Sequence, residues 1–271
     1  MGNLWVAVGV YLFTAGRAVD WLTLFGLVVG TGFVIGSACV LNNYLDRDMD
    51  ARMKRTANRP SVTGALPVKI ALPYAGLLFL LGTWALLGLV NSTTWWVGVI
   101  GAVWYVLVYG VAKRKTPHAT LIGTVAGATP PLAGYTAATG MVDTVGWLFL
   151  ALLVAWQMPH FYAIALFRAK EYAKAGVPVL SVVRGTTRTV WEMRAYTVLF
   201  IAILTQIYLA TSLTGITYSV LLGLALWWLW QHWAQPIDRD KWARKVFKIS
   251  LVLLPLYACL LALDPWLRSC P

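Results

Sequence analysis

Apolar runs of about 20 residues recur from one end of the chain to the other, and they limit what it can fold into. A helix of ~20 residues spans a hydrocarbon core of ~30 Å. Only 12% of the 271 residues are charged and 59% are hydrophobic, whereas a soluble domain carries about 25% charge. The remaining charge is too sparse to cover a soluble globule. The chain is therefore predicted to be an all-α, polytopic membrane protein.

About nine transmembrane helices are expected, joined by short connections that contain breakers such as Gly140 and Gly215. No stretch outside them is long enough for a soluble domain, so residues 1–271 are predicted to form a single transmembrane domain. The predicted spans are 2–16, 21–45, 70–90, 94–112, 119–139, 145–167, 190–212, 216–234 and 247–264.

The basic residues predict the orientation of these spans. All but two of the 22 lysines and arginines lie in four connections, each of which follows an even-numbered span. The four connections therefore share one face, and Arg17 and Arg268 lie on the other. By the positive-inside rule the basic face is cytoplasmic. Topology thus accounts for most of the net charge of +12, and nucleic acid is not expected as a partner.

The most informative polar stretch is CVLNNYLDRDMDARMKRTANRP at 39–60, which leads out of the second span. Asn42, Asp46 and Asp50 are spaced by four residues and share one face of a helix, whereas Asp48 points elsewhere. Mg²⁺ is typically held by one or two carboxylates together with substrate phosphates. The row of two carboxylates and one amide is therefore predicted to bind Mg²⁺.

A solvated helix end is the simpler interpretation of these acidic residues. However, a helix C-terminus favours cations over anions, so the row needs positive partners nearby. Arg55, Arg59 and their basic neighbours follow at once and supply that charge. Ionisable groups at membrane depth are also functional candidates by default. The mixture suits a site that binds Mg²⁺ and phosphate together.

A second mixed stretch follows the sixth span, at residues 167–188. Glu171 and Lys174 lie three residues apart there and are neighbours on a helical turn. Because the second and sixth spans are four helices apart, we predict two related four-helix halves and one additional helix. The two acidic stretches would then face each other across a cavity at the cytoplasmic rim.

These features suit the ionisation of an allylic diphosphate, which produces a carbocation and a diphosphate anion. Mg²⁺, arginine and lysine stabilise the anion. A water-poor, apolar and aromatic cavity would protect the cation and hold the prenyl chain. The 15 tryptophans and 12 tyrosines could line such a cavity, although interfacial positions are ordinary for many of them.

At these residues the sequence resembles the UbiA superfamily of intramembrane prenyltransferases. The resemblance covers nearly the whole chain, and the segment WQMPHFYAIALFRAKEYAKAGVPVLSVVRG at 156–185 is similar to the branch that farnesylates haem. Its other strong segments are NNYLDRDMDARMKRTANRP at 42–60, TLIGTVAGATPPLAGY at 120–135 and WARKVFKIS at 242–250.

The resemblance implies a UbiA-like bundle that transfers a farnesyl group from farnesyl diphosphate to the 2-vinyl group of haem B. Water adds as well, which gives a hydroxyethylfarnesyl side chain, and diphosphate is released. It also implies Mg²⁺ as cofactor, the lipid bilayer as surroundings, and a downstream haem A synthase or terminal oxidase assembly as partner. No transit peptide is visible, so we expect the plasma membrane of a prokaryote, with the active site facing the cytoplasm.

The resemblance further implies roles for individual residues. Asn42, Asp46, Asp50 and Glu171 would bind Mg²⁺ and carry the catalysis. Many members of the superfamily have two aspartates in the second motif, where this chain has Glu171 and then Lys174. The residues implied for diphosphate binding are all basic, with Arg55 and Arg114 placed first: Arg55, Arg59, Lys113, Arg114, Arg168 and Lys174.

His160 follows Pro159 in the sixth span, about three turns before Glu171. A neutral histidine at that depth can ligate haem iron or hydrogen-bond a haem propionate. It can equally satisfy a backbone carbonyl that the proline leaves without a donor. Haem binding by His160 is therefore one of two interpretations that the sequence leaves open.

Three other functions compete with haem farnesylation. Prenyl transfer to an aromatic quinone precursor needs the same diphosphate site, and only the 156–185 segment argues against it. A transporter also uses intramembrane acids and structural repeats, but its site lies near the midplane. A non-catalytic oxidase subunit would leave the acidic row without a purpose. Prenyl transfer is therefore the expected activity.

Overall fold

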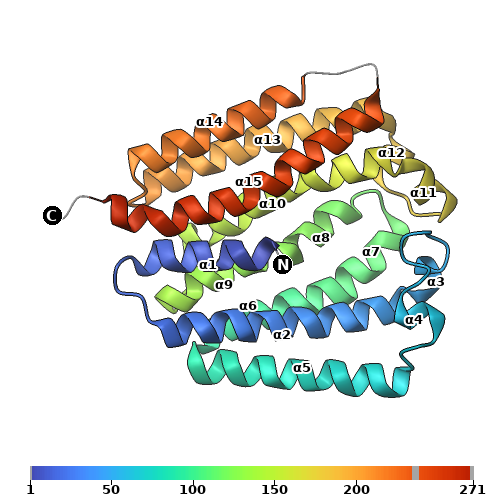
Figure 1. Cartoon of the computed structure of the whole chain (residues 1–271), viewed down its shortest axis with the longest axis horizontal. Helices are drawn as coiled ribbons and strands as arrows, with labels where there is room; N and C mark the ends of the chain where they lie inside the picture. The colour runs from blue at the N-terminus through green and yellow to red at the C-terminus, as the bar shows by residue number, and fades with distance from the viewer. Residues whose placement is uncertain (1, 234–237, 269–271) are drawn as a thin grey trace.

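The computed structural model describes residues 2–233 and 238–268, and the regular structure in these ranges is helical (Figure 1). In chain order the elements are α1 (Gly2–Ala15), α2 (Trp21–Leu45), α3 (Arg47–Asp50), α4 (Pro60–Thr63), α5 (Val68–Leu89), α6 (Ser92–Val103), the π-helical η1 (Trp104–Tyr109), α7 (Gly110–Lys115), α8 (Ala119–Gly127), α9 (Thr129–Thr139), α10 (Thr144–Phe167), α11 (Ala169–Lys174), α12 (Leu180–Val183), α13 (Gly185–Ala210), α14 (Gly215–Gln231) and α15 (Arg239–Leu267).

The prediction of an all-α membrane protein with about nine spans is confirmed. Six helical segments in the described ranges are long and apolar enough to cross a membrane: α2, α5, the continuous run from α6 to α7, α10, α13 and α15. The shorter α1 and α14 and the broken pair α8–α9 occupy the positions of the other three predicted spans. The predicted end of the eighth span, at 234, lies outside the described residues.

Two boundaries differ clearly from the prediction. The ninth span was expected to start at 247, but α15 begins at Arg239, where the Asp238 side chain accepts a hydrogen bond from the backbone N–H of Lys241. Asp238 is therefore an N-cap, and a capped helix can extend past the membrane into the basic region. Similarly, α13 starts at Gly185 rather than at 190.

The fifth span is not continuous but breaks at Ala128. Pro130 and Pro131 have no backbone N–H, so the carbonyls of Ala126 and Gly127 lose their helical donors. Side chains replace those donors: Thr129 Oγ1 lies 2.9 Å from the Ala126 carbonyl, and Asn3 Nδ2 lies 2.6 Å from the Gly127 carbonyl. The break is thus compatible with membrane depth because each freed carbonyl is satisfied within the protein.

The helices form two groups with α1 between them (Figure 1). One group contains α2, α5, α6–α7 and α8–α9, and the other contains α10, α13, α14 and α15. Helix α1 packs against α9 of the first group and α15 of the second. This arrangement of four, four and one agrees with the predicted halves; an evolutionary relation between the halves stays a prediction.

Glycines allow α1 to pack this closely on both sides. A Cβ atom at Gly9 would lie 2.5 Å from the backbone oxygen of Ala258 in α15, and one at Gly134 of α9 would collide with the backbone oxygen of Ala7. Backbone atoms cannot move aside as side chains can. The position of α1 between the two groups therefore depends on these two residues having no side chain.

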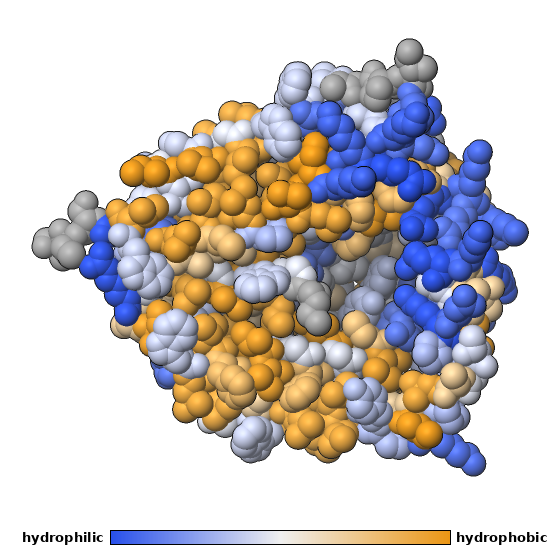
Figure 2. Space-filling view, viewed as in Figure 1, coloured by the Kyte–Doolittle hydropathy of each residue, from blue (hydrophilic) through white to orange (hydrophobic). Residues whose placement is uncertain are grey.

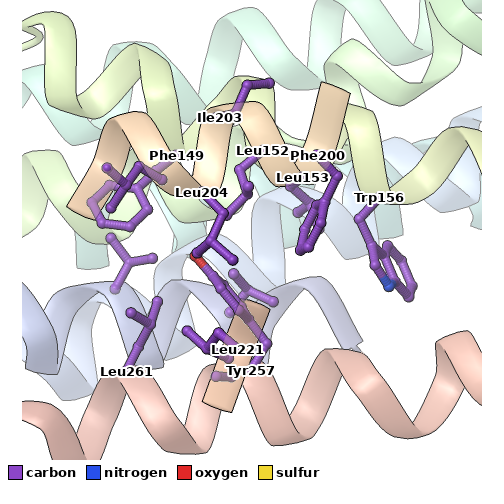
Figure 3. Packing of buried hydrophobic residues seen from close by; sticks show 14 of the residues in the cluster. Phe149, Leu152, Leu153, Trp156, Phe200, Ile203, Leu204, Leu221, Tyr257 and Leu261 are labelled. Atoms are coloured by element: carbon purple, nitrogen blue, oxygen red, sulfur yellow. The ribbon is translucent and has the colours of Figure 1, made fainter. Parts of the chain in front are cut away.

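The packed core and the outer surface have different chemistry. A cluster of buried apolar side chains from α10, α13 and α15 fills the second group, among them Phe149, Phe200, Leu204 and Tyr257 (Figure 3). Figure 2 shows a broad apolar surface on the face in view and a gathering of hydrophilic side chains at one end. This apolar surface is expected to face lipid, and the hydrophilic end includes the basic connections.

We predict that Gly134→Ala lowers stability by about 1–3 kcal/mol, because the added methyl group overpacks the α1–α9 contact. Gly88→Ala is the matched control, since a Cβ atom there meets no other atom within 4 Å. Thermal unfolding of both variants in detergent checks this. Equal midpoints for the two variants would show that the close approach of α1 is not needed.

Candidate active site

A cavity of about 540 Å³ lies between the two helix groups. Figure 2 shows the surface hollowed between the groups, next to the hydrophilic end. Its polar lining includes Asn42, Asp46 and Asp50. Its other walls are mostly apolar or aromatic and come from α2, α6–η1, α8–α9 and α10: Val34, Ile35, Ala38, Ala102, Tyr105, Tyr109, Ala133, Phe161 and Ile164. One cavity thus joins a charged end to an apolar interior.

The acidic row stays on one face although the long helix ends before Asp46. Helix α2 ends at Leu45, but the Asp46 N–H donates to the Asn42 carbonyl at 3.0 Å and the Asp50 N–H donates to the Asp46 carbonyl at 2.8 Å. This helical bonding across the junction keeps Asn42, Asp46 and Asp50 on one face. All three are buried, with exposed fractions of 6%, 4% and 2%.

Asp48 points away from the row, as the spacing predicted. Its side chain is 55% exposed and accepts two hydrogen bonds of 2.8 Å from Arg114. These bonds hold the pKa of the Asp48 carboxyl well below its usual value. Arg114 also donates to the Leu45 carbonyl at 2.7 Å and does not line the cavity. The pair lies beside the acidic row and stabilises the end of α2 from outside.

Each buried aspartate has a cation of its own. Arg59 Nη1 lies 2.6 Å from Asp50 Oδ2 and also donates to Asn43. Lys113 Nζ forms a short ion pair with Asp46 Oδ2. The other oxygen, Asp46 Oδ1, is buried and has no hydrogen-bond partner among the described residues; Arg114 Nη2 is 3.7 Å away. A buried, unbonded carboxylate oxygen is unusual and requires an explanation.

The row fits a divalent cation that shares its ligands with a substrate. In the described part of the chain no three residues of the types His, Cys, Asp and Glu are grouped so that they alone could hold a metal. Mg²⁺ does not need such a group, because it takes one or two carboxylates and completes its shell with phosphates and water. Asn42, Asp46 and Asp50 offer that donor set: Asp46 Oδ1 has no hydrogen bond within the described residues, whereas Asn42 Oδ1 and Asp46 Oδ2 accept from Lys113.

The second acidic motif adds Tyr172 to the cavity lining, but its Glu171 contacts the first motif through the backbone of Arg55. Glu171 Oε1 accepts from the Arg55 N–H at 3.4 Å, and Glu171 Oε2 accepts from Arg168 at 2.8 Å. Burial raises the pKa of Glu171, but these hydrogen bonds outweigh burial and the pKa lies below its usual value. Met53 of the first loop packs on Val177 of the second. The motif therefore holds the loop that follows the acidic row.

The basic residues expected to bind diphosphate fall into two sets. Arg55, Arg59 and Lys113 line the cavity. Arg114, Arg168 and Lys174 do not, and neither does Glu171. Arg114 and Arg168 are instead bonded to Asp48 and Glu171. Of the two residues that the sequence placed first, Arg55 lines the cavity and Arg114 does not.

His160 is buried between α10 and α15 and does not line the cavity. Its Nδ1 atom lies 2.7 Å from Ser250 Oγ, and its ring stacks on Trp156 and contacts Phe247. Ser250 donates its own hydroxyl proton to the Phe247 carbonyl at 2.7 Å. Ser250 must therefore accept from His160 Nδ1–H, which leaves a lone pair on Nε2. The ring bonds a hydroxyl and not a carbonyl freed by Pro159.

Several cavity residues were missed in the sequence. Tyr105 and Tyr109 line the cavity with stacked rings 5.5 Å apart, and they precede Lys113 at a spacing of four. Asn3 and Gln157 also line it, and their amides donate to the Gly127 and Thr124 carbonyls. Two features of the sequence could have indicated them. One is the four-residue spacing of the tyrosines and the lysine, and the other is the Pro-Pro pair, which leaves backbone carbonyls without donors.

Comparison with known proteins identifies the family. Residues 3–252 match the model of the UbiA prenyltransferase family. The chain belongs to this family. It is 38% identical to "Protoheme IX farnesyltransferase 2" of Shewanella woodyi, over 97% of this chain and 93% of that protein. It is 37% identical to "Protoheme IX farnesyltransferase" of Photorhabdus laumondii, over 99% of this chain and 92% of that protein. This UbiA protein is therefore a prenyltransferase.

Solved structures share its fold. A digeranylgeranylglyceryl phosphate synthase superposes with a TM-score of 0.79 at 16% identity, covering 98% of this chain and 94% of the other. A UbiA homologue from Archaeoglobus fulgidus, bound to DMAPP and Mg²⁺, gives a TM-score of 0.67 at 12% identity over 96% and 95% of the two chains. Both confirm the UbiA bundle as the fold of this chain.

Asp46 and Asp48, which both follow the end of α2, should behave differently. We predict that Asp46→Asn weakens Mg²⁺-dependent binding of a prenyl diphosphate by about 10-fold or more, since it removes a ligand charge. Asp48→Asn should stay close to wild type because Asp48 faces outward. Thermal-shift titration with the diphosphate, with and without Mg²⁺, measures both. Equal losses in the two variants would contradict the assignment of the row.

Proposed function

We propose that this protein transfers the farnesyl group of farnesyl diphosphate to the 2-vinyl group of protohaem IX (haem B), with addition of water, to give haem O and diphosphate. The observation that carries the proposal is the 37–38% identity, over nearly the whole chain, to proteins named protoheme IX farnesyltransferase. The cavity supports it, because a charged end suits a diphosphate and an apolar interior suits a farnesyl chain and a porphyrin.

The charged end is proposed to bind the leaving group. Asn42, Asp46 and Asp50 would hold Mg²⁺, which supplies positive charge where the diphosphate charge develops. Arg55, Arg59 and Lys113 line the same end and would bind the diphosphate oxygens. They would neutralise the leaving group as the bond to the farnesyl carbon lengthens. The apolar walls would exclude bulk water from the allylic carbocation.

The remaining assigned residues are proposed to act from the rim. Arg168 and Glu171 hold the backbone at Arg55, so they would position that side chain toward the diphosphate. Direct contact of Glu171 with Mg²⁺, or of Arg114, Arg168 and Lys174 with diphosphate, would require the two loops to close over the bound substrate. Their part in binding therefore stays a proposal about the loaded enzyme.

His160 is proposed as the haem-binding residue through its Nε2 atom. The hydrogen bond from Nδ1 to Ser250 selects the tautomer with a lone pair on Nε2, which is the form that ligates iron. His160 follows the cavity-lining Gln157 by one helical turn and adjoins the cavity-lining Phe161. Because His160 itself does not line the cavity, haem would reach it only after the side chains between them move aside.

Haem titration tests the role of His160. We predict that His160→Ala weakens binding of ferric haem to the purified protein and changes its Soret band, since an axial ligand is lost. His118→Ala is the control, because His118 is exposed near the end of α7. Spectra of the two variants that match wild type would mean that His160 only joins α10 to α15.

The location and partners follow from the same proposal. The hydrophilic end in Figure 2 carries the basic connections, so the positive-inside rule favours a cytoplasmic active site in the plasma membrane. Haem B and farnesyl diphosphate would be the substrates. The product would pass to a haem A synthase or a terminal oxidase assembly, because haem O is a modified haem for insertion into another protein.

A competition assay separates haem from other acceptors. The purified protein, supplied with Mg²⁺, farnesyl diphosphate, haem B and 4-hydroxybenzoate, should form only the hydroxyethylfarnesyl haem, as measured by mass spectrometry. EDTA should abolish the product because it removes the metal. Prenylated 4-hydroxybenzoate with unmodified haem would retain the prenyltransferase but overturn the acceptor. The third possibility, no prenylated product at all, would contradict the proposal entirely.

A further inference from the structure

Lys113 occupies the position in which the acidic row would hold a metal ion. The residue lies near the end of α7 and is only 5% exposed. Its Nζ atom lies 2.6 Å from Asn42 Oδ1 and forms the short ion pair with Asp46 Oδ2. Asn42 Nδ2 donates to the same carboxylate oxygen at 2.9 Å. One ammonium group therefore bridges two of the oxygens assigned to Mg²⁺.

A metal ion bound between Asn42 Oδ1 and Asp46 Oδ2 would compete with the ammonium group. Mg²⁺ requires ligand oxygens at 2.0–2.1 Å in near-octahedral geometry. The ammonium nitrogen lies 2.6 Å from Asn42 Oδ1 and pairs with Asp46 Oδ2, so an ion held by the same two oxygens would be next to it and the two positive charges would repel. Lys113 must therefore leave Asn42 and Asp46 when a metal binds between them.

Separating the Lys113 ammonium from Asp46 costs free energy unless another anion pairs with it. A buried ammonium without a partner carries a large desolvation penalty. The other acidic groups nearby are already paired: Asp48 with Arg114, and Asp50 with Arg59. The ammonium nitrogen also lies 5.1 Å from the centroid of the Tyr109 ring. This cation–π contact would compensate only weakly for a lost ion pair. The new anion has to come from the cavity.

We propose that Lys113 is a placeholder for the metal that makes Mg²⁺ binding depend on diphosphate. In the absence of substrate the ammonium neutralises Asp46. When a diphosphate enters the cavity, Lys113 transfers to its oxygens and frees Asn42 and Asp46 for the metal. Loss of diphosphate reverses the exchange. This inference rests on the proposed function, because it assumes that Asp46 is a ligand of Mg²⁺.

The two binding events are then linked. Linkage is reciprocal, so diphosphate tightens metal binding by the same factor by which metal tightens diphosphate binding. Couplings of this kind are typically about 5–150-fold. Without Lys113, Asp46 would attract a metal on its own and the diphosphate would lose one cation. The coupling should therefore fall, while affinity for the metal alone should rise.

Mn²⁺ is the probe for the test, because its binding to the full-length protein is followed by electron paramagnetic resonance. Mn²⁺ affinity is measured with and without farnesyl diphosphate, no acceptor is added, and the Mn²⁺–diphosphate complex is subtracted. Wild type should bind Mn²⁺ weakly alone and about 5–150-fold more tightly with farnesyl diphosphate. Lys113→Met should bind Mn²⁺ alone more tightly than wild type, and farnesyl diphosphate should tighten its Mn²⁺ binding by a smaller factor than in wild type.

Two further variants make the result decisive. Lys115→Met removes a charge from the exposed end of the same helix and should keep the wild-type coupling. Lys113→Gln retains a donor for Asp46 without the charge, so it replaces Lys113→Met if that variant does not fold, with the same expected result. Unchanged coupling in the Lys113 variant, or weaker binding of Mn²⁺ alone, overturns the placeholder.

Asp46→Asn separates failure of this inference from failure of the proposed site. If Mn²⁺ binding by wild type does not depend on Asp46, the metal assignment and the placeholder are both wrong. If binding depends on Asp46 but the coupling in Lys113→Met equals that of wild type, only the placeholder is wrong. A reduced coupling in the Lys113 variant, with the wild-type coupling retained in Lys115→Met, supports the placeholder.

Discussion

The central constraint in this molecule is the burial of two aspartates at the end of a membrane helix. Asp46 and Asp50 lie where both low polarity and the helix dipole disfavour negative charge. Each is stable only because a cation comes from elsewhere: Lys113 from α7 and Arg59 from the loop after α3. The first pair connects the end of α2 to α7, and the second connects α3 to the loop that follows it. The charged end of the cavity is a consequence of that pairing.

The rest of the fold serves to keep this end charged and the remainder of the cavity apolar. The two helix groups enclose the cavity, and α1 packs against both through Gly9 and Gly134. The break at Ala128 lets α8–α9 form one wall, with its freed carbonyls bonded by Thr129 and Asn3. The carbonyls freed at this break are thus satisfied within the protein, and the buried aspartates are gathered where a charged substrate would meet them.

The sequence predicted what depends on local spacing. Asn42, Asp46 and Asp50 stay in one row because helical bonding continues across the junction after Leu45, and Asp48 faces outward for the same reason. It did not predict partners that only the tertiary fold brings together, such as Lys113, 71 residues from Asn42. It also placed Arg114 among the foremost diphosphate ligands, whereas α7 directs it to Asp48. Neighbouring residues on a helix point in different directions, and composition alone does not say which one enters the cavity.

The account leads to one chemical claim, that this chain farnesylates haem B, and analysis of cellular haem tests it most directly. The protein would be expressed in a bacterium that makes haem B but no haem O, and haem from its membranes would be analysed by mass spectrometry. The account predicts a new haem heavier than haem B by one farnesyl group and one hydroxyl group, absent with Asp46→Asn. Haem B alone, with the protein present in the membrane, would contradict it.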